Sequence, residues 1–160
     1  MSADFKKMAP ESKVWVFPSR KKFYTNEIEE LEKKVQNFIE NWSINNLSLH
    51  ATSFLKYNRF IVICATSEEP ISTATTNELI SFIIELQETY NTELLDKMNV
   101  CFKQGKYVQY KELKDFKKLI KDKAVNKNTI VFDNLVSTKH EFDNYWETPA
   151  SESWYGNMFK

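Results

Sequence analysis

RFIVICAT, residues Arg59–Thr66, is the clearest structural signal in the sequence, because six successive apolar residues follow a single arginine. A run rich in β-branched and aromatic residues is typical of a strand, and a strand that is apolar throughout is typical of one buried on both faces of its sheet. Two further strands are predicted earlier in the chain, at KVWVF (Lys13–Phe17) and at Leu47–Tyr57. We therefore expect RFIVICAT to be a central strand that is covered on both faces.

Two amphipathic helices are predicted around these strands. The first begins near Asn26, because Asn26 and Glu29 have the spacing of a capping box, and the second begins near Thr75 and Glu78 for the same reason. Apolar residues recur at helical spacing in both segments. In the first helix they are Ile28, Leu31, Val35, Phe38, Ile39 and Trp42.

The C-terminal part has its own pattern of elements. NVCFK and YVQY flank QGK, which predicts a hairpin with Gly105 at its tip. A helix over Lys111–Lys123 and a strand over Asn128–Val136 are expected to follow. We therefore predict an α+β fold in a single compact unit. A loose arm at 1–12 precedes an α/β core at 13–97 with a ferredoxin-like βαββαβ order, and a hairpin–helix–strand subdomain occupies 98–160.

Composition excludes several classes of protein. The chain carries 22 basic and 22 acidic residues, so its formal net charge is zero and no overall field attracts nucleic acid or an anionic membrane. No apolar run has the length of about 18 residues that a membrane-spanning helix needs. The N-terminus has no apolar signal segment, and Cys64 and Cys101 lie in apolar runs typical of buried free thiols. These features predict a cytoplasmic protein.

Two glycines, Gly105 and Gly156, are the only ones in the chain. A phosphate-binding P-loop needs two glycines at close spacing and a dinucleotide-binding turn needs three, so neither can form. The Cys and His spacings of zinc sites are also absent, and His50 and His140 are the only imidazoles. We expect no cofactor, no metal and no catalytic residue, while an enzyme of unrecognised type remains a third alternative.

An aromatic segment closes the chain and is the first candidate for function. A tryptophan left exposed to water loses several kcal/mol relative to a buried one, so we expect these rings to pack against other apolar surface. They either cover an apolar edge of the protein's own sheet or engage a partner protein, and both can hold at once. The predicted partner-binding residues are Tyr145, Trp146, Trp154, Tyr155 and Phe159. On this basis the preferred prediction is a non-enzymatic adaptor that acts through protein contacts.

A lysine-rich helix is the second candidate. Lysines outnumber acids between 111 and 127, which favours an anionic partner such as RNA, although such a face is also typical of a solvated helix. Tyr107 and Tyr110 just upstream could stack on bases. The predicted anion-binding residues are Lys111, Lys114, Lys117, Lys118 and Lys121.

Two resemblances accompany these patterns. The run from Tyr110 to Trp154 resembles the closing part of bacterial GYF-like domains, in which a hairpin precedes a helix, a short strand and a late tryptophan. The residues that carry it are Leu113, Leu119, Ile120, Thr129, Val131, Phe132 and Trp146. Lys123 stands where that helix usually ends in glycine, and the resemblance implies binding of peptides or proline-rich ligands.

The whole chain is also similar to a family of small bacterial cytoplasmic proteins, some of them labelled as ATPases of ABC transporters. KVWVFPSRKKF, KYNRFIVI, LLDKMNVCF and NTIVFDNLV carry this likeness, together with ESW near the end. Because the chain cannot form a phosphate loop, we do not carry the ATPase label over to it.

Overall fold

The computed structural model describes residues 3–46 and 48–159, which form an α+β fold. Its first sheet consists of β1 (Lys13–Pro18), β2 (His50–Lys56) and β3 (Phe60–Thr66), in the order β1-β3-β2 with antiparallel neighbours. Every residue of β3 from Phe60 to Ala65 is buried. The prediction that this run forms a central strand covered on both faces is therefore confirmed.

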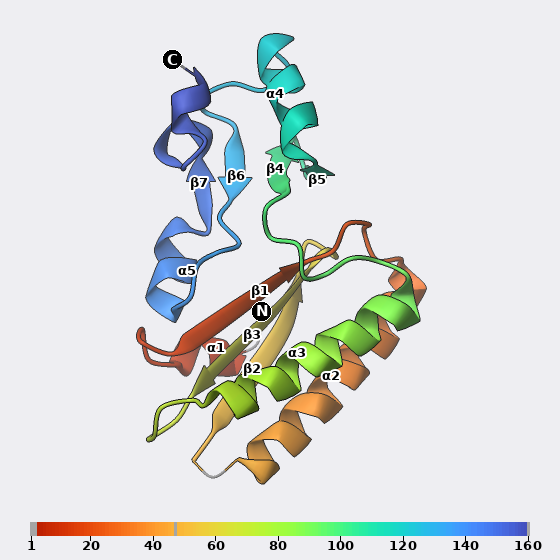
Figure 1. Ribbon diagram of the computed structural model, residues 1–160, viewed down its shortest axis with the longest axis vertical. Coiled ribbons are helices and arrows are strands. Elements are labelled where there is room, and N and C mark those ends of the chain that lie inside the picture. Colours follow the sequence, from red (N-terminus) through yellow and green to blue (C-terminus); the bar gives the residue numbers. More distant parts are fainter. Residues whose placement is uncertain (1–2, 47, 160) are drawn as a thin grey trace.

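Two long helices, α2 (Thr25–Asn45) and α3 (Thr73–Tyr90), lie side by side on one face of this sheet (Figure 1). The rings of Phe38 and Phe82 stack between the two helices with their centroids 4.3 Å apart. The predicted apolar faces are correct, and they bury Leu31, Val35, Ile39 and Trp42 from α2, and Leu79, Ile83, Leu86 and Tyr90 from α3.

The starts of both helices differ slightly from the predicted capping boxes. The Glu27 carboxylate accepts a hydrogen bond from the Tyr24 backbone N–H at 2.9 Å, so the N-terminus of α2 is stabilised two residues before the predicted pair. The Ser72 hydroxyl accepts from the Thr75 N–H at 3.1 Å and caps α3.

The opposite face of the sheet is covered by a short helix that the sequence did not predict, α1 (Ala3–Lys7). Phe5 and Met8 are buried, and the Phe5 ring lies 4.9 Å from that of Phe54 in β2. The prediction of a loose N-terminal arm is therefore wrong for residues 3–12, while residues 1–2 lie outside the described residues. Two apolar side chains near one turn apart are too few to give a periodic signal, yet they cover sheet surface that water would otherwise contact.

A second antiparallel sheet forms the C-terminal part, with the strand order β5-β4-β6-β7. Its predicted hairpin is present, with Gly105 at φ 62°, and the predicted helix is α4. The predicted strand over 128–136 is shorter because the Asp133 carboxylate accepts from the Leu135 N–H and turns the chain. The elements are β4 (Val100–Gln104), β5 (Tyr107–Lys111), α4 (Leu113–Lys121), β6 (Ile130–Phe132), α5 (Lys139–Tyr145), β7 (Glu147–Pro149), and the 3-10 turns η1 (Ala150–Glu152) and η2 (Gly156–Phe159).

The predicted ferredoxin-like order holds for the first five elements only. β4 joins the second sheet. The edge of β1 instead contacts the segment before α5: the Val14 N–H donates to the Ser137 carbonyl at 3.0 Å, and Lys13 and Thr138 form an isolated antiparallel β-bridge. One apolar cluster then spans both parts, with Val16 and Val62 from the first sheet and Phe132 and Trp146 from the second part. This shared cluster is why the chain forms one compact unit.

Within the described residues, no helix has the length and apolar character required to cross a membrane.

Candidate functional site

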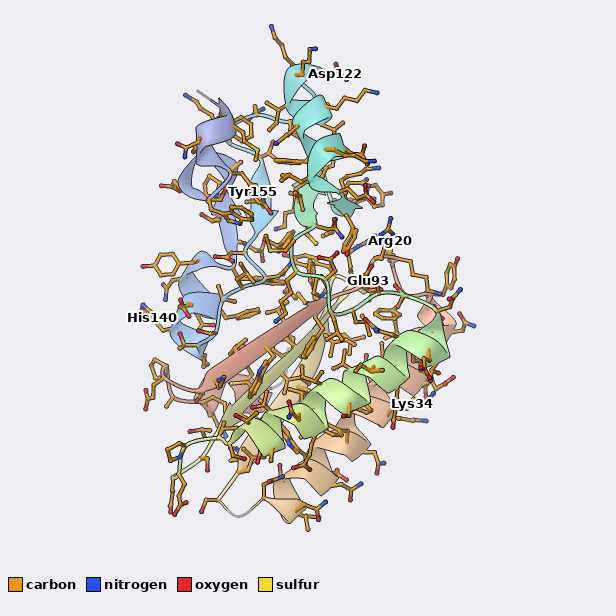
Figure 2. The ribbon with its side chains drawn as sticks, in the orientation of Figure 1. Arg20, Lys34, Glu93, Asp122, His140 and Tyr155 are labelled. Carbon is orange, nitrogen blue, oxygen red and sulfur yellow. The ribbon has the colours of Figure 1, made fainter. Side chains whose placement is uncertain are left out.

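Two of the five predicted partner-binding residues lie inside the protein. Trp146 is 2% exposed and donates its indole N–H to the Asn134 side-chain oxygen at 3.0 Å. Tyr155 is 3% exposed and its ring packs 5.5 Å from that of Phe116 of α4 (Figure 2). Neither can touch a partner in the folded chain, so their assignment to a partner surface is wrong. The alternative that the aromatic segment folds back onto the protein's own core holds for these two residues.

The other three predicted aromatic residues differ in how far they are exposed. Tyr145 is 56% exposed at the end of α5, whereas Trp154 is 51% exposed and lies against the Tyr155 ring at 4.7 Å. β7 and η1 separate Tyr145 from Trp154 along the chain, and Phe159 is partly buried against the cluster beneath α4. Tyr145 and Trp154 are therefore the two aromatic side chains of this group that a partner could reach most readily.

The five predicted anion-binding lysines are all exposed, and four of them share one side of α4. At 3.6 residues per turn, Lys114, Lys117, Lys118 and Lys121 fall within an arc of about 100°, and Asp115 and Asp122 fall outside it. Lys114 pairs with Glu112 at 3.5 Å. Lys117, Lys118 and Lys121 form no ion pair with any residue that the structure describes.

The free edge of β5 leads to this lysine-rich side. Side chains alternate along a strand, so Tyr107, Gln109 and Lys111 share one face of β5. That face also carries α4, because Phe102, which pairs with Gln109, packs against Phe116 with ring centroids 5.3 Å apart. Tyr107 is exposed. An exposed ring, a polar amide and a lysine therefore precede the lysines of α4.

A charged cluster that sequence reasoning missed joins the two sheets. The Tyr57 hydroxyl donates to the Glu147 carboxylate at 2.9 Å, and the same carboxylate forms an ion pair with Lys103. Burial raises the pKa of Tyr57, and the bond to Glu147 raises the pKa of Lys103. Tyr57 follows β2, Lys103 lies in β4 and Glu147 in β7, so only the contact between the two sheets brings these three residues together.

The loop between β1 and α2 is held at this junction by a buried arginine. The Arg59 guanidinium donates to the Ser19 and Arg20 carbonyls, each at 2.9 Å, and burial lowers its pKa. Arg20 lies beside Glu93 at 3.8 Å and Glu112 at 3.6 Å, which ties the loop to α4 (Figure 2). The loop is therefore fixed against the C-terminal part.

The remaining titratable groups offer little catalytic geometry. His50 is exposed at the start of β2 and forms no hydrogen bond with a carboxyl or thiol group of the described residues, and the His140 ring lies 3.2 Å from the Asn144 amide. Burial raises the pKa of both Cys64 and Cys101 to about 12, which keeps these thiols protonated. Among the described residues, no group of His, Cys, Asp and Glu could hold a metal ion.

A hollow of about 510 Å³ runs between α2 and β2 and is lined by Glu29, Glu32, Lys33, Val35, Gln36, Ser53, Phe54 and Leu55. Lys33 pairs with Glu29 at 3.4 Å within this lining. The side chains of this lining do not combine a general acid, a general base and a nucleophile at one point, so the hollow does not support a catalytic role.

No family model, curated protein or solved structure matches the chain. The resemblances to GYF-like domains and to the small bacterial family therefore stay predictions.

Proposed function

We propose that this protein binds single-stranded RNA through the lysine-rich side of α4 and the adjoining edge of β5. The observation that supports this proposal is the segregation of Lys114, Lys117, Lys118 and Lys121 on one side of a helix whose acids lie elsewhere. Three of the four have no ion pair in the described part of the chain, so their charges are free to meet phosphates.

Because the net charge of the chain is zero, attraction for RNA has to come from a local group of lysines such as this one. Lysines bind phosphates as point charges and release condensed counterions, which gives affinity without sequence preference. The exposed Tyr107 ring adds a surface on which any base can stack, a contact of about 1–3 kcal/mol per base. This combination fits a single-stranded RNA, which the protein would bind with little preference for its sequence.

The test is fluorescence anisotropy of a labelled, unstructured RNA of about 12 nucleotides at several salt concentrations, a length within the about 4–16 nucleotides that single-strand binding modules cover. The variant K117Q/K118Q/K121Q removes three phosphate contacts, so the slope of log K against log salt should fall by about 2, at about 0.7 per phosphate for a single strand. The charge-matched control K6Q/K7Q/K33Q changes exposed lysines of α1 and α2, remote from α4 (Figure 1), and should keep the wild-type slope. Equal slopes for the two variants, or no binding at low salt, would overturn the proposal.

A second candidate function is contact with a partner protein at Trp154, in keeping with the adaptor role predicted from the aromatic segment. The half-exposed indole rests on the buried Tyr155 ring, so it is held in place and costs little entropy to bury. Aromatic side chains that are rigid before binding are frequent anchors of interfaces.

Quenching of tryptophan fluorescence can report on Trp154 selectively, because Trp15, Trp42 and Trp146 are all buried. Acrylamide should therefore quench mainly Trp154, and a bound partner should protect it. Proline-rich peptides, which the GYF-like resemblance implies, are the first ligands to titrate. Trp154→Phe should abolish the protected signal, whereas Tyr24→Phe, at an exposed ring on the other part of the molecule, should leave it unchanged. Binding of equal strength to Trp154→Ala and wild type would remove Trp154 from any interface.

A further inference from the structure

Two hairpin tips and one loop enclose a small hollow at the junction of the two sheets. The hollow has a volume of about 190 Å³. Its lining comes from the β1–α2 loop, the β2–β3 turn and the β4–β5 turn, and consists of Lys22, Tyr57, Asn58, Lys106, Tyr107 and Val108. None of these segments is adjacent to another in the sequence.

The charge in this hollow is of one sign. Two lysines line it and no carboxylate does, and neither Lys22 nor Lys106 forms an ion pair with a residue in the described ranges. The nearby Glu147 is already engaged by Lys103 and by the Tyr57 hydroxyl. Other basic groups of the β1–α2 loop are neutralised, since Lys21 pairs with Glu27 at 3.7 Å. The Lys106 ammonium lies 5.7 Å from the centroid of the Tyr107 ring, and neither Lys22 nor Lys106 has a negatively charged partner among the described residues that line this hollow.

The walls are fixed before any ligand arrives. Tyr57 and Asn58 both have positive φ, at 56° and 54°, a conformation that costs a tyrosine about 1–3 kcal/mol and persists only when its surroundings hold it. The Tyr57 bond to Glu147 supplies part of that hold. The Phe23 N–H donates to the Asn58 carbonyl at 2.8 Å, which fixes the residue after Lys22 to the hairpin tip.

We propose that this hollow binds a phosphomonoester of the nucleotide class, with the phosphoryl group between Lys22 and Lys106. Such a group carries a charge of about −1.5 to −2 at pH 7, which two lysines match. The exposed Asn58 amide can donate to a phosphoryl oxygen, and the Tyr107 ring gives the attached base a stacking surface. Free mononucleotides and the phosphorylated end of an RNA strand share this chemistry.

The lysines of this hollow differ from those of α4, and a mononucleotide is too short to need α4, so this proposal and the proposed function can fail separately. AMP is titrated into the 15N-labelled full-length protein, and amide shifts are followed at residues 22, 58 and 106–108. Adenosine and inorganic phosphate serve as the two half-ligands, and Ile44→Ala, at an exposed site on α2, serves as a control for nonspecific effects of substitution.

AMP should shift these amides, adenosine should bind at least ten-fold more weakly, and inorganic phosphate should compete with AMP. Lys22→Gln/Lys106→Gln should weaken AMP at least ten-fold, while the K117Q/K118Q/K121Q variant should bind AMP as wild type does. Matching affinities of wild type and Lys22→Gln/Lys106→Gln for AMP, or equal affinities for AMP and adenosine, would overturn the proposal.

A comparison of 5′-phosphorylated and 5′-hydroxyl RNA then separates the two sources of the ligand. A preference of at least ten-fold for the phosphorylated strand, lost in Lys22→Gln/Lys106→Gln, assigns the hollow to a strand end. Equal binding of the two strands, with AMP still bound, assigns it to free nucleotides. An unchanged amide spectrum with AMP and with both RNAs would refute a phosphomonoester site altogether.

Discussion

Replacing Trp146 by alanine should destabilise the whole protein, although sequence reasoning placed this residue on a partner surface. The indole ring lies 4.6 Å from the Phe142 ring, 4.9 Å from Phe132 and 5.0 Å from Phe60, so it packs against both sheets and α5. Truncating a buried tryptophan costs about 3–5 kcal/mol, a large part of the about 5–15 kcal/mol that keeps a domain folded.

The indole N–H adds a smaller and separable contribution. Trp146→Phe keeps much of the ring volume but leaves the Asn134 side-chain oxygen, Oδ1, without its buried donor, which costs about 1–3 kcal/mol. Trp146→Phe should therefore fall between wild type and Trp146→Ala. Trp154→Ala is the matched control, because its half-exposed ring should cost about 0.5 kcal/mol or little more.

Urea unfolding followed by far-ultraviolet circular dichroism measures these differences. With an m-value of about 2 kcal/mol/M, Trp146→Ala should lower the midpoint by about 2 M and Trp154→Ala by a few tenths of 1 M at most. Both variants should unfold in a single transition, since the cluster around Trp146 belongs to both sheets. Equal midpoints for the two alanine variants, or a first transition confined to the C-terminal part in wild type, would refute this account of the core.

Three further predictions concern backbone strain, close packing and ionisation. Lys123 has φ 61° after α4, where the Lys123 and Ala124 N–H groups donate to the Ile120 and Leu119 carbonyls, so Lys123→Gly should raise the unfolding free energy by about 1 kcal/mol in a denaturant titration. A Cβ added at Gly156 would lie 2.6 Å from the Ser151 carbonyl oxygen, so Gly156→Ala should lower thermal stability by about 1–3 kcal/mol; an unchanged melting temperature would contradict this. Burial raises the thiol pKa of Cys64 and Cys101 from 9.0 to about 12, so their contribution to stability is complete below pH 9 and is lost as the pH rises toward 12. Urea midpoints measured between pH 8 and 11 should therefore fall less steeply in Cys64→Ala/Cys101→Ala than in wild type.

Elements with a local signal could be predicted from residue spacing alone. The apolar run of β3 required cover on both faces, the helical spacing of Leu31, Val35 and Ile39 required a buried stripe, and Gly105 permitted the left-handed turn of the β4–β5 hairpin. These features depend on the period of side chains along a helix or strand and on the conformational freedom of a single residue, both of which can be read within one short segment.

Which segments contact one another depends on long-range packing and is seen in the folded chain. This packing directed β4 into a second sheet, brought Ser137 to the edge of β1, and buried Trp146 and Tyr155 while leaving Trp154 exposed. It also gathered Lys22 and Lys106 at one hollow from loops far apart in the chain. An aromatic residue carries the same side chain whether its own core or a partner covers it, so its role depends on long-range packing, which residue spacing does not encode.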